Sequence, residues 1–168
     1  MPYPTGGPIA GVNVTNVDDS TNPLFALGTI VEGTNGTKFM YVKALSTVAQ
    51  YDAVCIKASG SAVAAEYGAV PITTTNALES VRVGFAQTAI ASSKYGWVAL
   101  EGQDLRVKCL IACQPKVPLF TTATAGSLDD AVVTAGHVHG VVALSSATSA
   151  SAPPIIAANP HIGIYAGG

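Results

Sequence analysis

The chain has 168 residues, enough for one domain with a sizeable core, and only 11% of them are charged, against roughly 25% in an ordinary soluble domain. Its net charge is −2 and its eight lysines and arginines are scattered, which argues against a nucleic-acid partner. No apolar run reaches the ~18 residues of a membrane helix, and the first residues lack the basic region and apolar core of a secretory signal.

The charges are confined to the middle of the chain. None falls in residues 1–17, and none follows Asp130. A surface so poor in charge is a solubility risk for a free monomer. We therefore expect a subunit that lies against other protein, with an extended N-terminal arm over residues 1–23 and an extended C-terminal arm over residues 145–168.

In chain order, the first predicted elements are two strands joined by a tight turn. Residues 28–33 and 38–44 are rich in β-branched and aromatic residues. Asn35-Gly36 between them favours a type I′ hairpin, because both residues tolerate positive φ. The second strand carries apolar residues on both faces, so we expect both faces to be covered.

More short strands follow, separated by turn residues, and we expect little helix, under ~15% against the usual third. The predicted strands are residues 48–57, 62–65, 81–86, 96–100, 105–111, 118–121 and 138–144. Many short strands with regular turn signals are typical of all-β folds. Residues 24–144 are thus predicted to form a β-sandwich, jelly-roll-like domain or small barrel.

The C-terminal segment changes in composition. From Ser145 a run of Ser, Ala, Thr and Pro is of low complexity and does not continue a strand. Apolar residues then return, and they need a surface to lie on: Ile155, Ile156, Ile162, Ile164 and Tyr165. This pattern predicts the extended arm over residues 145–168.

Three cysteines, Cys55, Cys109 and Cys113, fit no disulfide framework because their number is odd. If Cys109 and Cys113 share one strand, they lie ~13 Å apart, too far for a disulfide. We expect buried, reduced thiols, as in a protein made in a reducing cytoplasm.

The histidines suggest one metal site. His137 and His139 share a face of a predicted strand, and His161 could complete a three-histidine site with an open position if it folds back across the linker. Such a site could serve a metal-dependent hydrolase. No acidic partner is near, so the favoured interpretation is polar residues on the exposed face of a strand.

Two pairs of carboxylates, Asp18-Asp19 and Asp129-Asp130, stand beside turn-forming residues. Neighbours on a strand point apart, so hydrogen bonds from these side chains to turn backbone are favoured over acid–base catalysis. A calcium site formed by the first pair with Glu32 matches no EF-hand spacing.

Tyr41, Tyr51, Tyr95 and Trp97 could stack on a carbohydrate, but core or interface packing is favoured in a β fold with few aromatics. No nucleophile elbow, phosphate-binding loop, dinucleotide fingerprint or Cys-x-x-Cys motif occurs. We expect no catalytic, cofactor-binding or metal-binding residues, and no enzymatic activity.

One stretch is familiar. Residues 83–91 read VGFAQTAIA and residues 94–102 read KYGWVALEG, while residues 118–128 read PLFTTATAGSL before Gly140-Val141-Val142. Together they resemble the capsid cement, or head decoration, proteins of tailed bacteriophages. The resemblance implies a β-sandwich or jelly-roll knob on the outer face of the phage head, with no catalytic residues.

The resemblance implies that the protein cements neighbouring capsomers by binding the major capsid protein of the same phage, as a homodimer or homotrimer. It would be made in the cytoplasm of the host bacterium and end on the outer surface of the virion, without nucleic-acid or membrane partners. The alternative is another phage assembly subunit, such as a tail or fibre adaptor or a receptor-binding protein.

Overall fold

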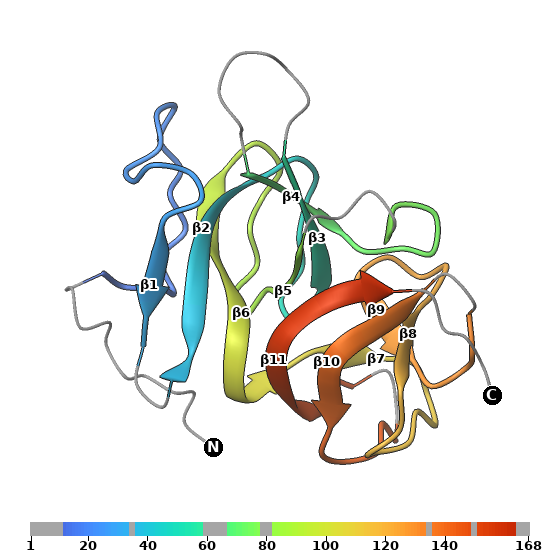
Figure 1. Ribbon diagram of the computed structural model, residues 1–168. Coiled ribbons are helices and arrows are strands. Elements are labelled where there is room, and N and C mark those ends of the chain that lie inside the picture. The colour runs from blue at the N-terminus through green and yellow to red at the C-terminus, as the bar shows by residue number, and fades with distance from the viewer. Residues whose placement is uncertain are drawn as a thin grey trace.

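The computed structural model is an all-β protein (Figure 1). It describes residues 12–33, 36–58, 67–77, 82–133, 136–148 and 151–163. No α-helix occurs among these residues, which agrees with the predicted fold class. The strands are β1 (Ile30–Glu32), β2 (Lys38–Ala44), β3 (Ala53–Ala58), β4 (Tyr67–Pro71), β5 (Arg82–Phe85), β6 (Tyr95–Arg106), β7 (Lys108–Cys109), β8 (Leu119–Thr121), β9 (Ser127–Asp129), β10 (His137–Ala143) and β11 (Pro154–Gly163).

The N-terminal half forms a small closed barrel. Strand β2 pairs in parallel with β4, and antiparallel pairings then run from β4 to β3, from β3 to β5 and from β5 to β6. The ring closes because β6 also pairs with β2, from Lys43↔Tyr95 to Lys38↔Glu101. Of the predicted alternatives, the small barrel is the one that forms. Strand β1 lies outside it, paired with β2.

The C-terminal half forms a second curled sheet. The end of β6 pairs with β11, β11 with β10, β10 with β8, β8 with β9 and β9 with β7. Strand β7 begins directly after Val107, so the last strand of this sheet continues from its first. In Figure 1 strands β8 to β11 of this sheet appear in orange and red beside the barrel, and the yellow β6 runs from one body into the other.

Strand β6 can serve both sheets because its backbone bends between them. Its first half is buried throughout, whereas Glu101 and Gly102 are half-buried and Gln103 and Asp104 are exposed. Gly102 and Asp104 both have positive φ, 147° and 59°. A side chain at Gly102 would meet Thr37, since an added Cβ would lie 2.6 Å from the Thr37 hydroxyl oxygen. Glycine there permits the two sheets to share one strand.

Both faces of the central strands are buried, as predicted for residues 38–44. Met40 and Val42 of β2 belong to an apolar cluster with Val54 and Leu100. The opposite face of β2, with Tyr41, belongs to a larger cluster that continues into the second sheet. A shared core joins the two bodies, so the described residues between 24 and 163 form one packed unit.

The C-terminal segment differs from the predicted arm. Residues 154–163 of the expected arm 145–168 form β11, a long strand inserted between β10 and β6. Its side chains alternate, with Ile155 and Ala157 buried and Ile156 exposed. The low-complexity run precedes the strand and serves as the connection from β10, so it does not separate an arm from the domain.

The other predictions can be placed against the strands. Strands β1 and β2 form the predicted antiparallel hairpin, although Asn35 of its turn lies outside the described residues, as does the predicted strand 62–65. The predicted strand 105–111 was wrong in its last two residues, because the chain turns after Cys109. Within the described part of the chain, no helix is long and apolar enough to cross a membrane.

Candidate functional site

The most distinctive surface is the outer side of β10 and β11, which we call the β10–β11 face. It carries Val142, Leu144 and Ile156, which are 41%, 40% and 40% exposed. Val142 and Ile156 are direct cross-strand partners, and the Leu144 amide donates to the carbonyl of Pro154 at 2.9 Å. Val142, Leu144 and Ile156 therefore occupy neighbouring positions on β11 and on β10 with the residue that follows it, two strands that lie side by side in Figure 1.

The outer side chains of these strands are exposed because the inner side chains are the ones that pack into the core. Val141, Ala143, Ile155 and Ala157 are at most 4% exposed. A bulge between His139 and Val141 shifts the alternation by one residue, so that Val138 before it and Val141 and Ala143 after it are all buried. There Gly140 has φ 73°, and an added Cβ would lie 2.2 Å from the carbonyl oxygen of Ala158. The sequence thus builds a rigid face, with apolar residues displayed outward by the strand period of two.

The same face carries the three histidines, at the other end from the aliphatic residues. The cross-strand register sets His139 opposite His161. Their rings stack with centroids 5.0 Å apart, and the His137 ring lies 3.9 Å from that of His139. The structure therefore brings together the three residues that the sequence proposed could meet.

These histidines do not converge on one point. The group of possible ligand atoms within 4.8 Å of one another among the described residues lies elsewhere, at Cys113, Asp129 and Asp130. The His161 Nδ1 lies 2.9 Å from the carbonyl oxygen of Asn159. Burial, followed by the nearby His139 and His161, lowers the pKa of His137, which favours its neutral imidazole.

No formal charge interrupts the β10–β11 face at neutral pH. The two strands contain no Asp, Glu, Lys or Arg, because the last such residue of the chain is Asp130. Salt bridges between described residues lie elsewhere, for example between Lys38 and Glu101 at 3.2 Å. Contacts on this face would therefore depend on apolar burial and hydrogen bonds.

Asp18 has the turn-bonding role predicted for it, and a structural role beyond that. Its carboxylate accepts hydrogen bonds from the Ser20 hydroxyl at 2.6 Å, the Tyr41 hydroxyl at 2.7 Å and the backbone amides of Ser20 and Leu24, both at 2.9 Å. These donors, the Ser20 hydroxyl first, hold the pKa of Asp18 far below its usual range. The network fastens the N-terminal segment to β2, and it occupies the carboxylate that a calcium ion would need.

Asp129 has the predicted role, because its carboxylate accepts hydrogen bonds from the backbone amides of Asp130 and Ala131, while Asp130 bonds to a distant segment. Asp129 ends strand β9, and the Asp130 carboxylate accepts a hydrogen bond from the Gln114 amide at 3.1 Å, a residue distant in sequence. The Cys113 thiol lies within 4.8 Å of a carboxylate oxygen of each of these two aspartates. The expected ~13 Å separation of Cys109 and Cys113 was wrong, because the chain turns at Ala112, with φ 71°, and the two thiols form a hydrogen bond.

The aromatic residues form a core, not an exposed platform. Tyr41, Tyr95 and Trp97 are 1%, 7% and 3% exposed. Phe25 of the N-terminal segment packs edge-on against the rings of Tyr41 and Trp97, each at 5.3 Å. Tyr51 lies apart in the turn before β3. The buried rings are inaccessible to a sugar, so the core interpretation holds for these three.

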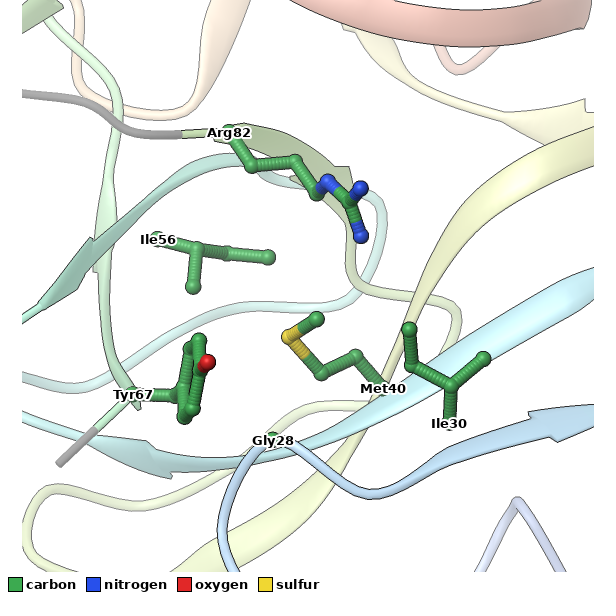
Figure 2. A pocket seen from close by; sticks show the side chains of 6 residues that line it. All are labelled: Gly28, Ile30, Met40, Ile56, Tyr67 and Arg82. Carbon is green, nitrogen blue, oxygen red and sulfur yellow. The ribbon is translucent and has the colours of Figure 1, made fainter. Parts of the chain in front are cut away.

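One pocket opens at an end of the barrel (Figure 2). Its volume is about 370 Å³ and its lining residues are Gly28, Ile30, Met40, Ile56, Tyr67 and Arg82. The Tyr67 ring lies beside Gly28, where an added Cβ would lie 2.2 Å from a ring carbon. Among the described residues, the lining has a phenol and a guanidinium but no carboxylate, imidazole or thiol, and so these residues lack the paired groups of acid–base or nucleophilic chemistry.

An interaction that the sequence analysis missed joins the two bodies. Lys108 of β7 forms an ion pair with Asp52, Nζ to Oδ1 2.6 Å, and Asp52 also accepts from the Ala49 amide at 2.7 Å. The Asp52 side chain is only 5% exposed. From the sequence, Asp52 is only a carboxylate in a turn. Its partner Lys108 is 56 residues away, and only the fold brings the two side chains together.

Comparisons with protein-family models and with curated proteins gave no match for this chain. The resemblance to phage head proteins therefore stays a prediction. Function is argued below from the chain's own residues and surfaces.

Proposed function

We propose that this protein is a non-catalytic structural subunit of a bacteriophage virion that binds the outer surface of the head and cements neighbouring copies of the major capsid protein. The observation that carries the proposal is the β10–β11 face, an exposed and rigid sheet surface without a charged residue. Centres of protein interfaces are depleted in charge in the same way, whereas an ordinary free surface is not.

Three physical features support an assembly role. The exposed aliphatic residues Val142, Leu144 and Ile156 are held by strands whose inner faces are buried, so little conformational entropy is lost on docking. The chain is poor in charge throughout. A homodimer or homotrimer on a repeated lattice would also gain avidity from several weak contacts.

The proposal includes the location and the partners. The protein would be made in the cytoplasm of the host bacterium and end on the capsid surface, bound to the major capsid protein and to copies of itself, without nucleic-acid or membrane partners. The alternative is a tail or fibre adaptor or a receptor-binding subunit. Burial of Tyr41, Tyr95 and Trp97 weighs against a receptor-binding site made of those rings.

The deciding experiment is to separate particles from the source lysate on a density gradient and to quantify this chain in the particle band by mass spectrometry. A copy number comparable to that of the major capsid protein is expected. A few copies per particle would favour the tail or fibre alternative, and a chain that stays in the soluble fraction would refute an assembly role.

A matched pair of variants tests the surface itself. Ile156→Lys introduces a charge at the centre of the β10–β11 face, whereas Val132→Lys introduces the same charge at a residue that is 65% exposed outside these strands. We expect only the first variant to lose co-sedimentation with heads, and we expect the binding of the unaltered protein to depend weakly on salt. Equal loss in both variants, or loss in neither, would refute this surface as the contact.

A further inference from the structure

Two cysteines, Cys109 and Cys113, and two aspartates, Asp129 and Asp130, lie near β7 and β9 of the second sheet, away from the β10–β11 face. Strands β7 and β9 pair in parallel, with Cys109 opposite Leu128. Because the two strands run in the same direction, the segments that follow them leave the sheet at the same end. The segment after β7 turns back at Ala112. Strand β9 ends at Asp129, and Asp130 follows it directly.

Backbone hydrogen bonds fix this arrangement. The Ala112 amide donates to the carbonyl of Ala147 at 2.9 Å, and the Ala147 amide donates to the carbonyl of Cys113 at 3.0 Å. The Gln114 amide donates to the Asp130 carboxylate at 3.1 Å. Segments distant in sequence are thus held together, so the side chains they carry are preorganised.

The side chains offer sulfur and oxygen ligands at close range. The Cys113 Sγ and one carboxylate oxygen from each of Asp129 and Asp130 lie within 4.8 Å of one another. The Cys109 thiol lies outside this group of three, but it forms a hydrogen bond with Cys113 and is therefore a further potential ligand. Around a tetrahedral zinc ion the ligand atoms lie roughly 3.5 Å apart, so small side-chain rotations suffice to bring the three grouped atoms to that spacing.

The cluster lacks a compensating cation among the described residues. The salt bridges between described residues involve other carboxylates, namely those of Glu101, Asp19 and Asp52. Burial is the main cause that raises the pKa of Cys109, Cys113 and Asp129, and the neighbouring acidic groups add to it. A divalent cation would reverse this effect, because it stabilises the deprotonated form of each group.

We propose that Cys109, Cys113, Asp129 and Asp130 form a structural binding site for a divalent transition metal of the zinc class. Thiolate and carboxylate together suit zinc, whereas calcium and magnesium take oxygen ligands only. With Cys109 added to the three grouped residues, four side-chain ligands leave no open position, which is typical of structural sites and not of catalytic ones. The ion would tie β7 to β9, where the second sheet closes.

Binding can be measured on the full chain with metal alone. We expect one zinc ion per chain by titration calorimetry, and a thiolate-to-metal charge-transfer band when cobalt replaces zinc. Because the thiols must lose protons, affinity should rise with pH. Zinc should also raise the midpoint of thermal unfolding in a concentration-dependent way, since it binds the folded state.

Variants separate this site from the other cysteine and from the histidines. Cys113→Ser and Asp130→Asn should each lower the affinity by more than the roughly 10–100-fold that a change outside the ligand shell costs. Cys55→Ser removes a buried thiol from the barrel and should leave affinity and charge-transfer band unchanged. Asp130→Asn keeps the side-chain size, so it remains informative if Cys113→Ser does not fold.

Three outcomes would overturn the proposal: no cobalt charge-transfer band, unchanged affinity in Asp130→Asn, or affinity that is lost in His139→Ala and kept in Asp130→Asn. The last result would place the metal at the histidines. None of these outcomes bears on the capsid role, because the metal cluster and the β10–β11 face are different surfaces.

Discussion

Replacing Ile155 by alanine tests whether the C-terminal segment belongs to the folded core. Ile155 is 0% exposed, and its cross-strand partners are Ala143 on β10 and Leu105 on β6, both also 0% exposed. Truncation of a fully buried isoleucine leaves a cavity and costs about 2–5 kcal/mol. For a chain of this length, a loss of about 3 kcal/mol lowers the melting temperature by roughly 6–12 °C.

The neighbouring residue supplies the control. Ile156 points outward from the same strand and is 40% exposed. Ile156→Ala should therefore stay within about 1 kcal/mol of the unaltered protein. Both variants can be compared by urea unfolding monitored at Trp97, which is buried in the shared core. If Ile155→Ala costs no more than Ile156→Ala, residues 154–163 are not a core strand, and the extended arm predicted from the sequence becomes the better description.

Three further predictions concern single interactions. Tyr41→Phe removes a donor to Asp18, whose low folded-state pKa contributes stability that is present above its unfolded pKa of about 4 and is lost as pH falls toward the folded value. The variant should show a smaller loss of stability between neutral and acidic pH, measured as melting temperature against pH. Lys108→Met leaves the buried Asp52 carboxylate without its cation and should cost about 1–2 kcal/mol, a value reduced because the lysine is partly exposed, and chemical unfolding of the double variant with Asp52→Asn should recover part of that loss. Gly140→Ala forces a side chain into positive φ and against the β11 backbone, so at least about 1–3 kcal/mol should be lost in the same assay, and a neutral result would contradict the bulge.

Several features were predictable because they depend on neighbours in sequence. The β1–β2 hairpin followed from Asn35-Gly36 between two β-rich segments, and the double burial of β2 followed from apolar residues on both of its faces. The bond from Asp18 to the Ser20 amide followed from turn chemistry. Each of these is decided within a few residues, where φ preferences and side-chain alternation act directly.

The misplaced features depend on contacts between distant segments. Pro154 and Pro160 interrupt the apolar pattern of segment 154–163, so the sequence alone predicted an extended arm and not a strand. The predicted strand 105–111 failed at its end for a similar reason, because the turn at Ala112 is fixed by hydrogen bonds of Ala112 and Cys113 with Ala147. Alternation can place a side chain on a face, but it does not select the partner strand.

By itself, the sequence determined that the chain is all-β, that its charges stop at Asp130 and that no familiar catalytic motif is present, because composition and short-range periodicity carry this information. Only the tertiary structure decided that β11 lies between β10 and β6, that His161 faces His139, and that the Cys113 thiol meets two carboxylates beside β9. Strand pairing depends on burial and hydrogen bonds summed over segments far apart in the chain, and no local pattern encodes that sum.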